Sequence, residues 1–161
     1  MKNQLESFTY KFLSILPLMA LFIITLSSCS QKMQIGNENS GGVVIYIDES
    51  GQHGIIAAEK DLQGEYSWDN AKYACTTLKL NGYSDWRLPN KSEMRQIFLN
   101  RKVIDDLSVK DSTKGFSGGQ YWTSTEHQEG SEYAWEQYID NGKQFGAPKN
   151  LKLNVRPIRS F

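Results

Sequence analysis

The N-terminus of the chain is an apolar run that ends at a cysteine, and this feature decides how much of the chain has to fold. Residues 12–26 (FLSILPLMALFIITL) follow a lysine-containing start, and two serines separate this run from Cys29. A basic start, a short apolar stretch and small residues before a cleavage point form the layout of a secretory signal peptide. We therefore expect residues 1–28 to be removed, which leaves 133 of the 161 residues, enough for one domain.

The residues around the cleavage point, Leu26 to Cys29 (LSSC), resemble a bacterial lipobox. The resemblance implies that Cys29 becomes the first residue of the mature chain and is lipidated at its sulfur and at its amino group. The alternative is a retained transmembrane helix, which needs about 20 apolar residues. Only 15 residues separate Lys11 from Ser27, and Pro17 interrupts them. We therefore expect a lipid anchor at the bacterial cell envelope, with the outer membrane as its location.

Cysteine usage excludes a fold held by an internal disulfide. The chain has two cysteines, and once Cys29 carries lipid, Cys75 has no second cysteine to pair with. A domain of this length buries enough apolar surface to fold by packing alone. The full chain has 18 basic and 18 acidic residues, and without a basic excess we predict no nucleic-acid partner.

Residues 41–161 show the mixed pattern of a single α+β domain. Residues 29–40, which have few large apolar side chains, are expected to form a flexible tether. Residues 42–47 and 53–58 are apolar runs separated by turn residues, which predicts a hairpin. Residues 151–155 alternate apolar and polar side chains, which predicts a final strand that pairs with this hairpin.

Two helices are predicted in the first half of the domain. Ser67 is placed to cap a first helix, whose apolar face consists of Trp68, Ala71, Cys75 and Leu78. Asn90 followed three residues later by Glu93 is typical of a capping box, which predicts a second helix. Residues 102–119 are polar and end in glycine, so we expect a long loop there.

The second half is predicted to be rich in strands. Residues 121–125 and 132–139 have the composition of strands. Residues 140–143 (DNGK) predict a hairpin turn, because Asn-Gly tolerates the positive φ that a type I′ turn needs. Gln144 and Phe145 begin the return strand.

Four short motifs in a characteristic order match one known family. They are residues 41–44 (GGVV), 82–89 (GYSDWRLP) with Glu93 behind them, 121–126 (YWTSTE) and 155–159 (VRPIR). Together they resemble the Lcl C-terminal domain-like family, a bacterial extracellular domain, over roughly residues 41–161. The resemblance implies a C-type-lectin-like fold with two helices and a twisted antiparallel sheet. It implies no activity, because one fold hosts many functions. Within the second motif we interpret Trp86 as buried and Arg87 as paired with carboxylates or carbonyls.

Better-known members of that fold differ from this chain at their functional residues. Formylglycine-generating enzymes use two active-site cysteines, whereas Cys75 stands alone on an apolar helix face, where an inert thiol is expected. Calcium-dependent lectins use disulfides and a Trp-Asn-Asp strand, whereas residues 68–70 (WDN) lie at a predicted helix start. His53 and His127 are far apart in sequence and do not supply three or four metal ligands. We therefore expect no enzyme, no bound metal and no cofactor.

Charge is unevenly distributed near the C-terminus. Residues 126–140 hold five acidic and no basic residues, whereas residues 141–161 hold five basic and no acidic ones. The two runs form cross-strand ion pairs in a hairpin, or the basic run contacts an acidic polysaccharide, as the family's adhesin member suggests. Calcium held by the acidic run is a third reading. The candidate ligand-binding residues are Trp122, Glu126, Trp135, Lys143, Lys149 and Lys152.

These observations favour a lipid-anchored envelope protein whose lectin-like domain binds a glycan or a partner protein, with a role related to adhesion. The expected partners are the membrane, through Cys29, and an acidic polysaccharide or an envelope protein. A structural or assembly lipoprotein of an envelope complex is the alternative. An enzyme is a further alternative, although no nucleophile–base pair or metal cluster emerges from the sequence.

Overall fold

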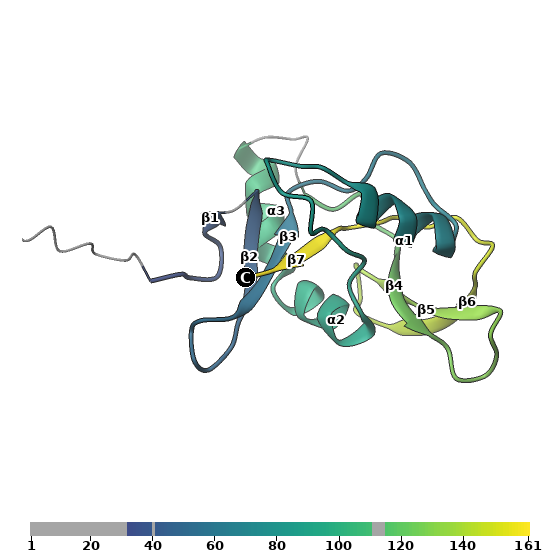
Figure 1. Ribbon diagram of the computed structural model, residues 1–161. Coiled ribbons are helices and arrows are strands. Elements are labelled where there is room, and N and C mark those ends of the chain that lie inside the picture. The colour runs from purple at the N-terminus through teal and green to yellow at the C-terminus, as the bar shows by residue number, and fades with distance from the viewer. Residues whose placement is uncertain (1–31, 40, 111–114) are drawn as a thin grey trace, which may run out of the picture. The chain divides into compact units, whose positions relative to one another are not determined.

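The computed structural model describes residues 32–39, 41–110 and 115–161, except for the side chains of residues 39 and 107–110 (Figure 1). The predicted signal peptide and Cys29 lie outside the described residues. The strands are β1 (Glu38–Asn39), β2 (Gly42–Ile47), β3 (Gly54–Ala58), β4 (Gln120–Glu126), β5 (Tyr133–Tyr138), β6 (Gln144–Pro148) and β7 (Ile158–Ser160). The helices are α1 (Trp68–Thr77), α2 (Lys91–Leu99) and α3 (Arg101–Lys110).

The α+β class is confirmed, but the described part has a third helix and two sheets where two helices and one sheet were expected. Helix α3 replaces much of the predicted long loop. That prediction rested on polar composition, yet Lys102 and Asp106 pair at 2.6 Å, and Arg101 and Asp105 at 4.0 Å. Such pairs at i and i+4 support a helix, and the buried Ile104 attaches α3 to the core. The C-type-lectin-like assignment stays a prediction.

The first sheet has the order β1-β2-β3-β7, and its pairings are antiparallel. Ile56 of β3 pairs with Arg159 of β7, which confirms that a C-terminal strand joins the early hairpin. This strand begins at Ile158 and not within residues 151–155. The reason is that Pro157 has no amide hydrogen to donate to a continuous ladder.

Strand β1 falls within the segment that the sequence predicts to be a tether. Glu38 pairs with Val43 of β2. Further upstream, the Gly36 amide donates a hydrogen bond to the Val44 carbonyl at 2.8 Å. The folded part of the chain therefore includes residues that precede residue 41.

The second sheet has the order β4-β5-β6 and contains the predicted Asn-Gly hairpin. The Tyr138 amide donates to the Lys143 carbonyl at 2.9 Å, and the Gly142 amide donates to the Tyr138 carbonyl at 2.8 Å. Gly142 has a φ of +72°, whereas Asn81 is the one non-glycine residue with positive φ in the described ranges. A type I′ turn needs positive φ at both central residues, so that part of the prediction is wrong.

Both predicted helix starts are present, and they are capped differently. Ser67 occupies the N-cap of α1, but its side chain makes no capping hydrogen bond. At α2, the Asn90 side chain accepts a hydrogen bond from the Glu93 amide at 2.8 Å, and the Glu93 carboxylate accepts one from the Asn90 amide at 2.8 Å. The predicted capping box is therefore confirmed.

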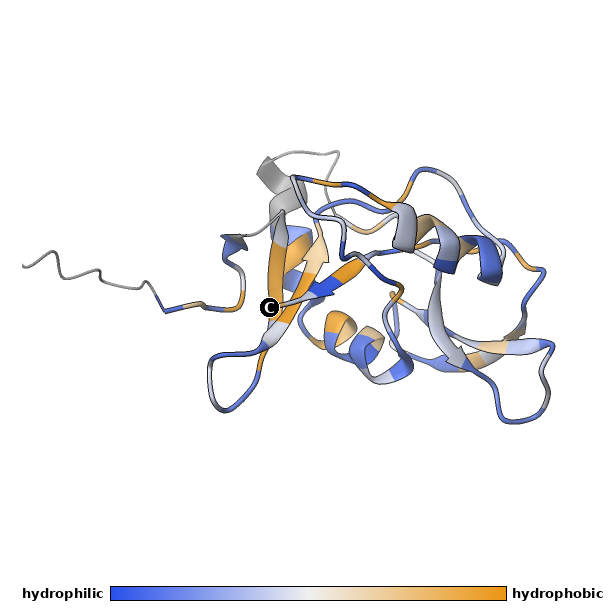
Figure 2. Ribbon diagram, in the orientation of Figure 1, coloured by the Kyte–Doolittle hydropathy of each residue, from blue (hydrophilic) through white to orange (hydrophobic). Residues whose placement is uncertain are grey.

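The core consists of three apolar clusters, and Figure 2 shows apolar residues concentrated along β2 and β3. The first cluster contains Val43 of β2 and Ile97 of α2. The second contains Trp68 of α1 and Trp122 of β4. Val44 belongs to the third cluster. Because Val43 and Val44 point to opposite faces of the first sheet, both faces are covered at β2.

The segment of residues 82–89 is held by a buried indole and two ion pairs. Trp86 is buried. Arg87 donates to both carboxylate oxygens of Glu93 at 2.7 Å, which confirms the paired interpretation of this arginine. Arg159 of β7 donates to the Asp85 carboxylate at 2.8 and 3.0 Å and lowers the pKa of Asp85. The segment is therefore attached to α2 and to β7.

Candidate functional site

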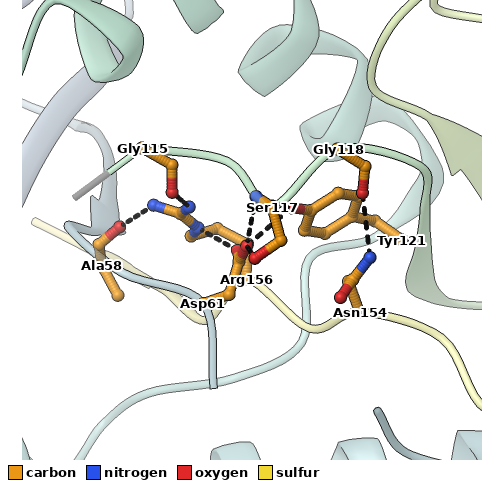
Figure 3. A network of polar contacts seen from close by, with 8 residues as sticks. All are labelled: Ala58, Asp61, Gly115, Ser117, Gly118, Tyr121, Asn154 and Arg156. Atoms are coloured by element: carbon orange, nitrogen blue, oxygen red, sulfur yellow. Dashed lines mark hydrogen bonds and ion pairs between the residues drawn. The ribbon is translucent and has the colours of Figure 1, made fainter. Parts of the chain in front are cut away.

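A buried polar cluster is centred on Arg156 and Asp61 (Figure 3). Arg156 Nε donates a hydrogen bond to Asp61 Oδ1 at 2.7 Å. Its Nη1 donates to the Ala58 carbonyl at 2.7 Å, and its Nη2 donates to the Gly115 carbonyl. All three guanidinium nitrogens thus donate to oxygens of the protein itself.

The second Asp61 oxygen is equally occupied. It accepts hydrogen bonds from the Tyr121 hydroxyl at 2.6 Å and from the Ser117 amide and hydroxyl at 2.9 and 2.8 Å. Burial, followed by the nearby Asp61 charge, raises the pKa of Tyr121. Nearby, Asn154 Nδ2 donates to the Gly118 carbonyl at 2.9 Å. These groups hold the residues before β4 against the C-terminal segment, so we assign the cluster a structural role.

A hollow of about 520 Å³ opens at the edge of the second sheet, and we call it the aromatic hollow. This volume is within the range of roughly 300–1,000 Å³ found for small-ligand sites. The hollow is formed by the loop after β4 and by β5 and β6. Its lining residues are His127, Glu129, Tyr133, Trp135, Gln144, Phe145 and Gly146.

Trp135 is held in place by two neighbouring side chains. The ring centroids of His127 and Trp135 are 4.3 Å apart. Lys91 Nζ lies 2.9 Å from the centroid of the Trp135 ring, where the ring quadrupole attracts a cation. Gly146 makes room for His127, because a Cβ atom at Gly146 would lie 2.7 Å from His127 Cδ2. The indole is therefore positioned without any ligand.

Hydrogen bonds also order the loop that carries His127 and Glu129. The His127 amide donates to the Tyr133 carbonyl at 2.9 Å, and the Tyr133 amide donates to the Gly130 carbonyl at 3.1 Å. The Glu129 amide donates to His127 Nδ1 at 3.3 Å. These bonds place an imidazole and a carboxylate beside the Tyr133 ring.

Tyr133 and Phe145 are the two exposed rings that line the aromatic hollow, with exposed fractions of 42% and 49%. Phe145 makes an edge-to-face contact with Tyr138 at 5.8 Å between centroids. Large exposed aromatic side chains beside a concave surface are typical of binding sites. The register pairs Gly146 with Trp135, so the side chain of the neighbouring Phe145 lies on the sheet face opposite to Trp135. Tyr133 is therefore the exposed ring on the Trp135 face, where it can contact a ligand that enters the aromatic hollow.

The edge of β6 adds polar main-chain groups to the aromatic hollow. The Tyr138 amide bonds the Lys143 carbonyl, which sets the pattern of the β5–β6 ladder. Along a strand that is paired on one side, the main-chain groups of one residue bond to the partner strand and those of the next point away from it. The main-chain groups of Gln144 and Gly146 therefore point toward the open edge.

The candidate ligand-binding residues do not form one site. Trp135 lines the aromatic hollow. Trp122 is fully buried, and its Nε1 donates to the Tyr66 carbonyl at 2.7 Å, so it is a core residue and does not face a ligand. Glu126 and Lys149 form an ion pair at 3.1 Å, the kind of contact expected between the acidic and basic runs.

The basic run is not a continuous strip on the surface. Arg156 and Arg159 are buried and pair with acidic residues that lie outside the acidic run. Lys143 is exposed near the hairpin turn, and Lys152 lines a separate polar depression. The charges of this run are therefore divided between the interior and separate parts of the surface.

Sequence reasoning did not single out most of the residues that line the aromatic hollow. The alternation in β5 mixes aromatic and polar side chains on both faces, so it does not show which of its aromatic side chains is exposed. His127 was considered only as a metal ligand and Phe145 only as part of the return strand, and Gly146 had no predicted role. The available signal was an aromatic residue on each side of the Asn-Gly turn.

The described residues include one buried thiol and no cluster of metal ligands. Cys75 is buried in α1, and burial raises its pKa to about 12, so its position on a buried helix face is as predicted. Within the described ranges, no group of three or more His, Cys, Asp or Glu side chains could hold a metal ion. In the same ranges, no helix has the length and apolar character needed to cross a membrane.

The fold and the aromatic hollow define an α+β binding module. Comparison with protein families places the chain more closely, since the model of the Lcl C-terminal domain matches residues 48–159. The chain belongs to the Lcl C-terminal domain family. No curated protein gives a significant match to the chain.

Proposed function

We propose that this protein is a lipid-anchored envelope protein whose Lcl C-terminal domain binds a glycan in the aromatic hollow. The observation that carries the proposal is the exposed ring of Tyr133 on the same sheet face as the positioned ring of Trp135, in the lining of the aromatic hollow. The proposed role is related to adhesion, because a glycan-binding module held at the envelope attaches its carrier to surfaces that display the glycan.

Aromatic rings suit glycans for a physical reason. The C–H groups on one face of a pyranose ring form an apolar surface with a slight positive charge, and the face of an aromatic ring is negative. The hydroxyl groups around the sugar need hydrogen-bond partners, which the Glu129 carboxylate and the outward main-chain groups of Gln144 and Gly146 supply. An aromatic lining with a few polar groups is the usual composition of a ligand site.

The envelope location is proposed from the segment that ends at Cys29. One acyl chain gives only marginal membrane binding, so the several chains of a bacterial lipoprotein are needed for stable attachment. We propose the outer membrane as the location. The proposal assigns no reaction to the protein.

Glycan binding is tested with the full-length protein on an array of neutral and acidic glycans. We expect binding to at least one glycan, and we expect the Tyr133→Ala/Phe145→Ala variant to lose it. Tyr73→Ala is the matched control, since Tyr73 is an exposed aromatic residue on α1. Equal binding by both variants would reject the aromatic hollow as the site, and absence of any binding would reject the function.

The anchor is tested by the Cys29→Ser variant. Membrane fractionation and mass spectrometry should show a lipidated, shortened wild-type chain and an unlipidated variant. A variant that still fractionates with membranes after uncleaved chain is excluded would contradict the proposed anchor.

A partner protein is the second candidate ligand, and the open edge of β6 favours it, because an extended segment can add to such an edge. The usable edge is short, since Pro148 ends the strand and has no amide hydrogen. This candidate includes the structural or assembly role in an envelope complex. Cross-linking in cells through a photoreactive residue at position 145 would reveal such a partner.

A further inference from the structure

We infer that the aromatic hollow takes an uncharged glycan, one built of pyranose units without sulfate or carboxylate groups. The inference rests on the proposed glycan-binding function and names the ligand class of that site. It departs from the expectation of an acidic polysaccharide that follows from the charge runs of the sequence.

The charged side chain in the lining of the aromatic hollow is acidic. Glu129 contributes a carboxylate to the aromatic hollow, and no lysine or arginine is among the described residues that line it. A sulfated or carboxylated glycan would bring negative charge beside Glu129 without a cation in the lining to offset it. A like-charge contact of this kind disfavours such a ligand.

Two lysine ammonium groups near the aromatic hollow already contact side chains of the protein. Lys91 Nζ packs on the Trp135 ring at 2.9 Å. Lys149 pairs with Glu126 at 3.1 Å and lies 4.2 Å from the Trp68 centroid. A polyanion would therefore compete with the Trp135 ring and with Glu126 for these two ammonium groups.

The aromatic hollow offers main-chain groups and carboxylate oxygens to a ligand. The Gln144 side chain already donates to the Lys91 carbonyl at 2.9 Å and to Gln137 Oε1 at 2.6 Å. Its main-chain groups and those of Gly146 point to the open edge, and Glu129 adds acceptor oxygens. Two main-chain donors and two main-chain acceptors beside a carboxylate match hydroxyl groups, which both donate and accept.

Gly146 leaves the space that the His127 ring occupies beside Trp135. A Cβ atom there would lie 2.7–3.0 Å from three atoms of the His127 ring. Gly146→Ala should therefore displace His127 from Trp135 and weaken glycan binding, while both exposed rings stay in place. This variant reports on the positioned ring pair independently of Tyr133 and Phe145.

The test compares matched polymers that differ only in charge, dextran and dextran sulfate, together with cellohexaose and chitohexaose as neutral oligosaccharides. Binding to the full-length protein is measured by titration calorimetry at about 0.05 M and about 0.5 M salt, because screening weakens ionic contacts. We expect a neutral ligand to bind with an affinity that changes less than about twofold between the two salt concentrations. The Tyr133→Ala/Phe145→Ala variant should bind it at least about tenfold more weakly.

The outcomes separate the inference from the proposed function. If only dextran sulfate binds, steeply dependent on salt and lost in Lys143→Gln/Lys152→Gln, the ligand class is wrong while glycan binding stands. If none of the four ligands binds, and the glycan array is also negative, the proposed function fails together with the inference. Neutral binding that is unaffected by the double aromatic variant overturns the assignment of the ligand to the aromatic hollow.

Discussion

Arg156 Nε and Asp61 Oδ1 lie 2.7 Å apart although 95 residues separate the two side chains in the sequence. The exposed fractions of the two side chains are 0% and 7%. This ion pair joins the segment before α1 to the segment before β7, and the Tyr121 hydroxyl and Ser117 complete it (Figure 3). Local sequence patterns give no indication of such a pair.

Asp61→Asn should destabilise the fold severely, because it leaves the Arg156 charge buried without its counter-charge. Breaking a buried ion pair by removal of one partner costs about 3–5 kcal/mol. Urea denaturation followed by tryptophan fluorescence measures the change. Asp69→Asn is the matched control, since the Asp69 side chain is 79% exposed and pairs with Lys72 at 3.6 Å. It should change stability by less than about 1 kcal/mol, and similar losses in both variants would contradict the structural role of the cluster.

Loss of the N-cap side chain should change the stability of the protein differently at the two helix starts. Asn90→Ala should cost about 1 kcal/mol, because the Glu93 amide loses its acceptor. Ser67→Ala should have an effect close to zero, since the Ser67 side chain makes no capping hydrogen bond. Chemical denaturation of both variants provides the comparison. A larger loss for Ser67→Ala than for Asn90→Ala would show that the caps are assigned the wrong way round.

Replacement of Glu136 by a neutral residue should stabilise the fold by an amount that depends on pH. Glu136 is buried, its Oε2 has no hydrogen-bond partner among the described residues, and burial raises its pKa above the ordinary 4.5. Below that value the carboxyl is protonated in both the folded and the unfolded chain, so it costs nothing. As pH rises toward the folded-state pKa, the unfolded chain releases its proton first, and the wild type loses stability relative to a neutral variant.

Glu136→Gln should therefore be more stable than the wild type at pH 7, by about 1 kcal/mol, with the difference disappearing near pH 4. Denaturation midpoints measured across this pH interval check the prediction. Glu132→Gln, which alters an exposed glutamate just before β5, controls for the loss of one negative charge. A gain that is the same at every pH would mean that ionisation of Glu136 is not its cause.

Alanine substitutions at two glycines distinguish the free-energy cost of backbone strain from that of steric overlap. Gly64 has a φ of +86° and nothing within 4 Å of an added Cβ atom, so Gly64→Ala should cost only the left-handed conformation, about 1 kcal/mol. Gly142 has a φ of +72°, and an added Cβ atom would overlap the Phe98 ring. Gly142→Ala should cost about 3 kcal/mol, because overpacking adds to the strain. Equal losses in thermal or urea denaturation would show that Phe98 moves aside freely.

The features that were predicted correctly depend on residues close together in the chain. The capping box needs only Asn90 and Glu93, three residues apart. The hairpin around Gly142 depends on a turn signal between two strand-forming runs. Helix α3 was missed because its ion pairs at i and i+4 look like the charges of a polar loop until the buried Ile104 attaches one face to the core.

By itself, the sequence determined the α+β class, both hairpins, two of the helices and the family, because these follow from local spacing and from short motifs in order. Only the tertiary structure decided that Trp122 is buried while Tyr133 and Phe145 are exposed. It also decided that Arg156 and Arg159 have Asp61 and Asp85 as partners. The physical reason is that exposure and ion pairing depend on which distant segments pack together, and alternation along a single strand cannot show which of its faces another element will cover.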